Sequence, residues 1–143
     1  MTTPAMLPDL QSSLVCDDVR QERNGKFILI GIFDAIAVPQ YPATFHRLCI
    51  VNRWCCGDGE FTQQSRLLKP DGVTVLTEGK PVAVKLSSNT STATCVEIFL
   101  NIQFDHPGVY WTEILLDGQL KLRYPLRAGL VPAAPPRPPA QPA

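Results

Sequence analysis

Five cysteines and two histidines are the residues of this chain that metal binding or nucleophilic catalysis would need. Structural zinc sites use four thiolates or imidazoles, usually in pairs a few residues apart. Cys55 and Cys56 are adjacent, so on a strand their side chains would point to opposite faces, and His46 shares a face with Cys56 only at long range. His106 falls in a predicted turn, away from any thiol. We therefore predict no metal site and no Cys–His pair, and we expect all the thiols to be free: Cys16, Cys49, Cys55, Cys56 and Cys95.

Motifs of other catalytic classes are missing as well. The chain has no G-x-S-x-G elbow, no phosphate-binding loop and no dinucleotide fingerprint. The segment Gly57-Asp58-Gly59-Glu60 offers too few oxygen ligands for a calcium loop. Asp17 and Asp18 are neighbours on a predicted strand, so their carboxylates face apart. We predict a protein that is not an enzyme and that has no catalytic residues and no cofactor.

Composition narrows the class of partner. The 143 residues include 13 basic and 13 acidic side chains, so the formal net charge is zero. Nucleic-acid binding needs clustered basic charge, and the sequence has no run of Lys or Arg. The first residues lack the features of a secretory signal, and no apolar run reaches the ~20 residues of a membrane helix. We predict a cytoplasmic protein that binds neither nucleic acid nor membrane.

Apolar alternation and turn residues predict an all-β fold. From residue 94 to 104 the alternation places Val96, Ile98, Leu100, Ile102 and Phe104 on one face, predicted to be the core face. Asn24-Gly25 and Asp117-Gly118 are hairpin signals. Further turns are predicted at 57–59 and 69–72, and a polar loop at 87–92. About eight strands and no helix longer than a turn favour an antiparallel Greek-key β-sandwich.

The predicted domain boundaries follow composition. Residues 1–10 form an N-terminal extension, residues 11–128 the β-sandwich domain, and residues 129–143 a proline-rich, disordered tail. The tail is expected to be a solvated terminus, with a polyproline ligand for a partner's aromatic groove as the alternative.

One strand, predicted from Lys26 to about Val38, is apolar on both faces. Phe27, Leu29 and Phe33 alternate with isoleucines at 28, 30 and 32. An antiparallel strand with one solvent-exposed face should carry polar residues on that face, so it should not show this pattern. Either Gly31 marks a bulge that resets the alternation, or both faces are covered.

Exposed apolar surface is the strongest functional signal. With the core face assigned as above, several apolar residues of the C-terminal hairpin point outward, which is typical of a contact surface. The alternative is that a loop or the tail folds over this face. The predicted interface residues are Cys95, Phe99, Val109, Trp111 and Leu115.

Two resemblances add to this interpretation. The segment from Asp105 to Tyr110 resembles the tyrosine corner of immunoglobulin-like sandwiches, and Trp54 could match their buried tryptophan, although Thr112 stands where those domains carry a cysteine. Residues from Pro8 to about 128 resemble a family of uncharacterised bacterial proteins, on the segments LVCDDVR (14–20), GKFILIGIF (25–33), PDG (70–72) and PGVY (107–110). The first resemblance implies a fold, and the second implies no activity.

Together these observations predict a non-enzymatic interaction or structural module. It would self-associate, as a homo-oligomer, or dock with a protein partner in a larger bacterial assembly. The alternative is a small-ligand-binding or hydrolytic protein, with a pocket among loops near residues 39–44 and 87–92.

Overall fold

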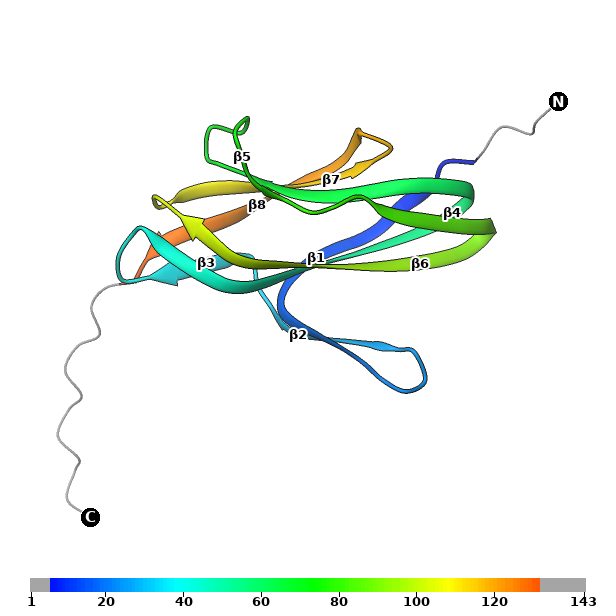
Figure 1. Ribbon diagram of the computed structural model, residues 1–143, viewed down its shortest axis with the longest axis horizontal. Helices are drawn as coiled ribbons and strands as arrows, with labels where there is room; N and C mark the ends of the chain where they lie inside the picture. The colour runs from blue at the N-terminus through cyan, green and yellow to red at the C-terminus, as the bar shows by residue number, and fades with distance from the viewer. Residues whose placement is uncertain (1–5, 132–143) are drawn as a thin grey trace, which may run out of the picture.

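The computed structural model describes residues 6–131, which form an all-β structure with no helix in that range (Figure 1). A curled mixed sheet forms a half-barrel around one core. Its strands are β1 (Asp9–Gln21), β2 (Phe27–Ile32), β3 (Ala35–Val38), β4 (Ala43–Leu68), β5 (Val75–Glu78), β6 (Val82–Phe104), β7 (Gly108–Leu116) and β8 (Gln119–Leu130).

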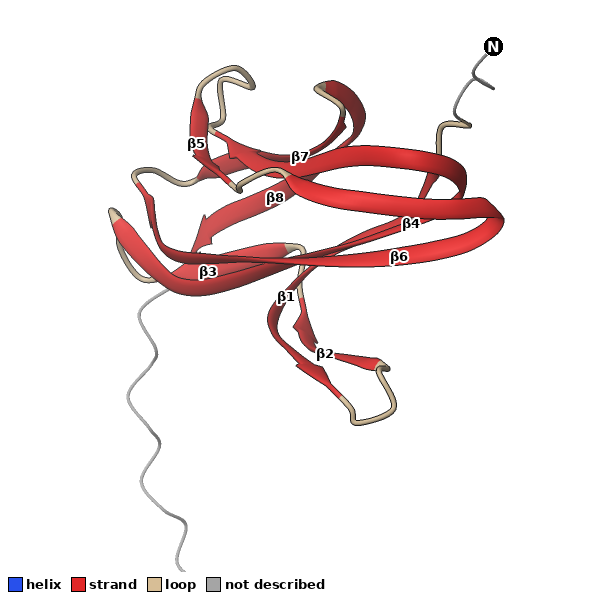
Figure 2. Ribbon diagram, turned by 45° about the vertical axis from the view of Figure 1, so that its right-hand side comes forward, coloured by secondary structure: helices blue, strands red, loops and turns tan. Residues whose placement is uncertain are grey.

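Two long strands, β4 and β6, pass through both layers of the half-barrel (Figure 2). The first half of β4 lies between β1 and the second half of β6. The second half of β4 lies between the first half of β6 and β7. The first layer therefore contains β2, β1, the first half of β4 and the second half of β6. The second layer contains the second half of β4, the first half of β6, and β7, β8 and β3.

The predicted turn at residues 57–59 and the predicted loop at residues 87–92 are wrong, because both segments stay within β4 and β6. A register shift between Cys55 and Gly57 and positive φ at Cys56 (62°) and Gly59 (135°) bend the paired strands instead. A bulge of this kind redirects a strand while most of its ladder survives. Both strands can thus move from one layer to the other without a loop.

At the second edge of the sheet, β3 runs parallel to β8, so the prediction of purely antiparallel pairing is wrong there. This pairing extends β8 to Leu130, and the Val131 N–H donates to the Val38 carbonyl at 3.0 Å. The predicted tail therefore begins later than residue 129, and its remaining part, 132–143, lies outside the described residues. At the other terminus β1 begins at Asp9, inside the predicted extension 1–10, of which residues 1–5 are also outside the described range.

The core follows the predicted alternation in β4 and β7. Leu48, Ile50 and Trp54 are fully buried, and Leu67 and Ile114 are buried farther along. The core is closed by aromatic packing between Phe104 and Tyr110, whose ring centroids are 4.8 Å apart in an edge-on arrangement.

The predicted core face of β6 is wrong over residues 95–100. Phe99 is 5% exposed and faces inward, whereas Ile98 (52%) and Leu100 (64%) face outward. Asn101 adopts a left-handed conformation with φ 53°, which reverses the face of the strand, so Ile102 and Phe104 are buried as predicted. Asparagine is among the few residues that tolerate this conformation. The apolar residues of the sequence alternate without a break through this segment, so the alternation alone does not reveal the reversal.

The turn predicted at Asp117-Gly118 agrees with the structure. Asp117 (φ 48°) and Gly118 (φ 77°) form the two-residue turn between β7 and β8. Tyr110 is buried, and its hydroxyl donates to the His106 carbonyl at 2.7 Å. This hydrogen bond lies within the segment whose sequence resembles a tyrosine corner.

Candidate interaction surface

The five residues predicted as an interface do not form one exposed face. Cys95 and Phe99 point into the core, and Leu115 is also buried, so the predicted exposure of these three is wrong. Trp111 is half-buried with the guanidinium of Arg123 5.8 Å from its ring centroid. Only Val109, at 39% exposed, is open to solvent. For Cys95 and Phe99 the error follows from the inverted face of β6, whereas Leu115 lies in β7, where residues on both faces near its end are buried.

The exposed apolar surface lies instead on the β1–β2 hairpin, which projects from the body of the molecule (Figures 1 and 2). β2 is the first strand of the sheet order and pairs with β1 on one side only. Its sequence, FILIGI, carries no charge. The exposed fractions are 37% for Phe27, 43% for Ile28, 44% for Ile30 and 57% for Ile32. Gly31 does break the regular strand geometry, with a left-handed φ of 68°, whereas the alternative that both faces are covered is wrong, since β2 remains open on both faces.

A groove separates this hairpin from the outer face of the first layer. Phe27 and Leu29 line it from the hairpin, and Leu14 and Val51 line it from β1 and β4. Arg53 and other polar residues occupy its rim. Beneath the hairpin, the cross-strand neighbours Cys16 and Cys49 are fully buried and pack against Val19, Leu29 and Val96. This small second core fixes the base of the hairpin to the sheet.

Next to the groove, the outward residues of β6 extend the apolar area. Ile98 pairs with Cys49, and Leu100 pairs with Arg47, whose guanidinium lies 2.9 Å from Asp18. A hydrogen bond from the Val19 N–H, assisted by Arg47, lowers the pKa of Asp18. We call this area the hairpin surface and define it as Leu14, Phe27, Ile28, Ile30, Ile32, Ile98 and Leu100. An apolar area with a charged border is typical of a contact site.

The interior contains an unexpected polar cluster. The side-chain amide of Asn52 donates to Gln63 Oε1 at 2.8 Å and to Ser65 Oγ at 2.7 Å, and all three residues are fully buried. The Ser65 N–H donates to the carboxylate of Glu97 at 3.3 Å. Burial raises the pKa of Glu97 above its ordinary value, and hydrogen bonding from Ser65 opposes this effect. Within residues 6–131, four buried atoms of this interior lack a hydrogen-bond partner: Asn52 Oδ1, Gln63 Nε2, Glu97 Oε2 and Thr112 Oγ1.

A slot between β1 and β8 is lined by cross-strand neighbours of this polar interior, since Ser13 pairs with Asn52 and Tyr124 pairs with Thr112. Ser13 and Tyr124 line it, and their hydroxyl groups are 2.8 Å apart. Phe33 and Asp34 line the slot from the segment after β2. Sequence reasoning missed this site because Ser13 and Tyr124 are far apart in the chain. The two segments predicted to share a pocket lie apart, because residues 39–42 precede the start of β4 whereas residues 87–92 lie within β6 and pair near the central bend of β4.

An ion-pair row on the outer face of the second layer also escaped prediction. The buried carboxylate of Glu113 lies between Arg66 (2.8 Å) and Arg123 (2.7 Å), and these three residues are direct cross-strand neighbours. Both guanidinium groups are paired with this one carboxylate, so we assign the row a role in holding β4, β7 and β8 together rather than in binding.

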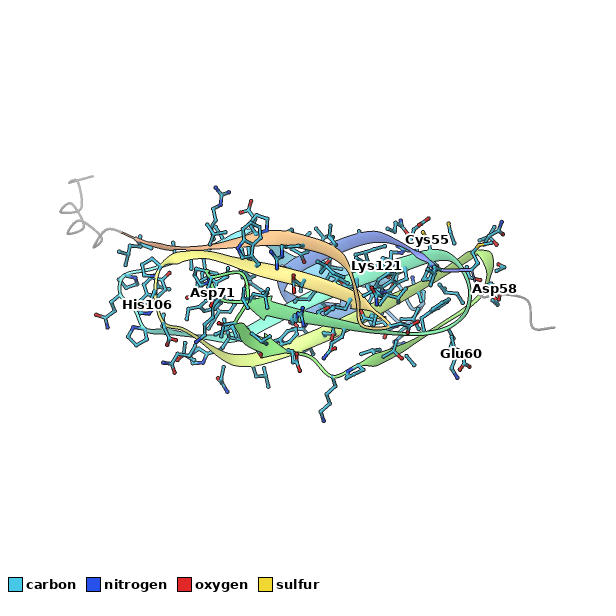
Figure 3. All side chains as sticks on the ribbon, turned by 90° about the horizontal axis from the view of Figure 1, so that it is seen from above. Cys55, Asp58, Glu60, Asp71, His106 and Lys121 are labelled. Carbon is cyan, nitrogen blue, oxygen red and sulfur yellow. The ribbon has the colours of Figure 1, made fainter. Side chains whose placement is uncertain are left out.

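The residues considered for metal or nucleophilic chemistry remain separate. None of the five cysteines forms a disulfide. Figure 3 places His106 at one end of the molecule and Cys55 at the other, and His46 lies 3.4 Å from the side-chain oxygen of Asn101. Across residues 6–131, no three Cys, His, Asp or Glu side chains gather in a metal-binding group. The same range holds no helix that is long and apolar enough to cross a membrane.

Comparison with known proteins places the chain in a family. Residues 11–129 match the model of a family of unknown function (DUF6941), so the chain belongs to that family. A search of the curated proteins finds no match.

Proposed function

We propose that this protein is a non-enzymatic interaction module of the bacterial cytoplasm, which binds another protein chain through the hairpin surface. The observation that carries this proposal is β2, an uncharged apolar strand at the edge of the sheet with both faces partly exposed. Natural proteins usually protect such edges with charge, proline or a covering segment, because an open edge recruits other strands. A site that pairs with a partner is the functional use of the same property.

The geometry adds two features that suit a protein partner. The groove beside the hairpin could take apolar side chains, and Ile98 and Leu100 widen the contact area beyond it. Polar groups at the rim, including Arg53 and the Asp18–Arg47 pair, would orient the partner.

Affinity capture from the native host tests this proposal. Immobilised wild-type protein should retain a specific chain, including further copies of itself, and Ile30→Lys or Leu100→Lys should abolish that retention. Val73→Lys is the matched control, since Val73 is 79% exposed but lies in the turn before β5. Circular dichroism checks that the variants fold. Equal retention by all the variants would contradict the proposal.

A second candidate function, binding of a small polar ligand, rests on the slot and the unpartnered polar atoms behind it. Buried polar groups that lack partners carry a free-energy cost that a ligand or ordered water could offset. Tyr124→Phe should then weaken binding of any small molecule that stabilises the wild type in a thermal-shift screen. If no compound in a broad screen raises the melting temperature, this candidate loses its support.

We also infer an evolutionary or structural relation to immunoglobulin-like Greek-key sandwiches. The Tyr110–His106 hydrogen bond and the buried Trp54 support it. An experimental structure, compared strand by strand with that fold, tests this relation.

A further inference from the structure

Cys55 and Cys56 are an exception to the separation of the residues considered for nucleophilic chemistry. In a regular strand two adjacent side chains face opposite sides, and the sequence predicts that arrangement for this pair. The prediction is wrong. Trp54 and Gly57 are both buried, whereas the two cysteines between them are half-buried and exposed. Both thiols therefore lie on the outer side of β4.

The change of face along β4 explains this position of the thiols. The residues of β4 that belong to the main core have even numbers before the bend and odd numbers after it: Leu48, Ile50 and Trp54, then Phe61 and Leu67. Cys56 is the residue at which the alternation shifts, since it has a φ of 62° and no partner in the β4–β6 register. A bulge gives one face of a strand an extra residue. At this bulge the extra residue is a second cysteine beside the first.

The two thiols also interact with each other. Hydrogen bonding with the Cys56 thiol is the largest of the effects that raise the pKa of the Cys55 thiol, and partial burial adds to it. Of the charged groups that act on Cys55, Asp9 raises this pKa and Arg53 lowers it. Cys55 therefore keeps its proton at neutral pH and lies beside a thiol that solvent can reach.

The backbone at this pair is held in place by neighbouring strands. Cys55 pairs with Asp9 of β1 on one side and with Thr92 of β6 on the other. Figure 3 places Cys55 at the end of the molecule that also carries Asp58, and the Asp58 N–H donates to the Met6 carbonyl at 2.9 Å. A ligand that contacts both thiols thus has little backbone to order, which lowers the cost of binding.

The geometry of adjacent cysteines selects the chemistry of that ligand. Neighbouring Cα atoms are ~3.8 Å apart, whereas a disulfide usually spans about 4.4 Å or more, so a direct S–S bond would be strained. A structural metal ion needs further ligands, and within residues 6–131 no three Cys, His, Asp or Glu side chains gather in a metal-binding group. A soft atom that needs only two sulfur ligands fits both conditions. Trivalent arsenic that carries one organic group is such an atom, because its own carbon fills the third position.

We propose that Cys55 and Cys56 form a dithiol site that captures monosubstituted trivalent arsenicals, R–As=O. The exposed sulfur of Cys56 forms the first As–S bond and the sulfur of Cys55 forms the second. Both S–H bonds and the As=O bond break, and the two protons leave with the oxygen as water. Arsenic remains trivalent, so the step needs no oxidant or reductant. This site is independent of the proposed function, because it lies at the start of β1 and the hairpin lies at its end.

Intact mass spectrometry of the reduced full chain with equimolar phenylarsine oxide tests this site. The wild type should carry one adduct that excess 2-mercaptoethanol leaves in place and that 2,3-dimercaptopropanol removes. Cys55→Ser and Cys56→Ser should each weaken the adduct by roughly 10²–10⁴-fold, because only one sulfur remains, so 2-mercaptoethanol should remove it. Cys49→Ala is the matched control, since it breaks the other neighbouring pair of cysteines, which is fully buried, and it should keep the adduct.

Thermal unfolding tests whether the fold presents the two thiols together. The adduct should raise the melting temperature of the wild type, because the unfolded chain must order both cysteines to bind. An adduct that does not raise it would show that the Cys-Cys sequence binds equally well without the bend, and would overturn the proposal. A wild type with no stable adduct, or a stable adduct in Cys55→Ser or Cys56→Ser, would also overturn it. Loss of the adduct in folded Cys49→Ala would assign the binding to the buried pair instead.

Discussion

Truncation of two neighbouring residues of β6, Phe99→Ala and Leu100→Ala, tests the face assignment on which the hairpin surface depends. Phe99 is 5% exposed within the core, whereas Leu100 is 64% exposed on the outer face. The two residues share a strand, a sheet and a position next to Asn101. They differ mainly in the direction of their side chains, so each serves as the control for the other.

The expected loss for Phe99→Ala follows from its burial. A buried phenylalanine side chain removes roughly 200 Å² from water, and at about 25 cal/mol per Å² the part beyond alanine is worth roughly 3 kcal/mol. The cavity that remains raises the loss to about 3–5 kcal/mol. Leu100→Ala removes a side chain that is already mostly in water, so its loss should stay below about 1 kcal/mol.

Urea unfolding followed by circular dichroism measures this difference. With a slope of about 2 kcal/mol per M, Phe99→Ala should lower the midpoint by roughly 1.5–2.5 M, and Leu100→Ala by less than about 0.5 M. If Phe99→Ala does not fold, Phe99→Leu should still show the larger loss of the two positions. Equal losses, or a larger loss for Leu100→Ala, would refute the inward orientation of Phe99.

Three further predictions concern buried polar groups. Tyr110→Phe removes a buried hydrogen bond and should lower the free energy of unfolding by about 1–2 kcal/mol in the same urea assay; an unchanged midpoint would argue against that bond. Burial raises the pKa of Glu97, so the contribution of this carboxyl to stability is largest when it is protonated and falls as pH rises through the raised folded-state pKa. Glu97→Gln should therefore gain stability relative to wild type as pH rises above the ordinary carboxyl pKa of about 4.3, and parallel pH profiles of the two proteins would contradict this. Burial raises the pKa values of Cys16 and Cys95 to about 11. In the native protein these two thiols should therefore react with Ellman's reagent much more slowly than the exposed thiol of Cys56. Rapid labelling of all five cysteines would show that the interior is open to the reagent.

Features that depend on short segments could be predicted from the sequence. The all-β class, the Asp117-Gly118 turn and the hydrogen bond of Tyr110 each depend on residues within a few positions of one another. The alternation of β4 and β7 also identifies residues of both strands that face the core, among them Leu48, Ile50, Tyr110 and Ile114. Local signals are sufficient where strand geometry is regular.

Features that depend on distant pairing could not be predicted. The parallel contact of β3 with β8 joins residues far apart in the chain, and no local pattern encodes it. The inversion in β6 had one signal, Asn101, whose left-handed conformation is permitted by its type but is not required by it. The hairpin surface had a stronger signal, the apolar residues on both faces of the segment from 27 to 33. Its exposure could be recognised only when β2 was placed at the edge of the sheet.

The passage of β4 and β6 through both layers has a consequence for folding. Most of the paired residues of the half-barrel include a residue of β4 or β6. The strands of one layer therefore lose paired neighbours when the other layer unfolds. We expect their central amides to exchange with solvent only through global unfolding, whereas the projecting hairpin can open alone. The strand that we propose as the contact site would thus open without disturbing the strands that hold the molecule together.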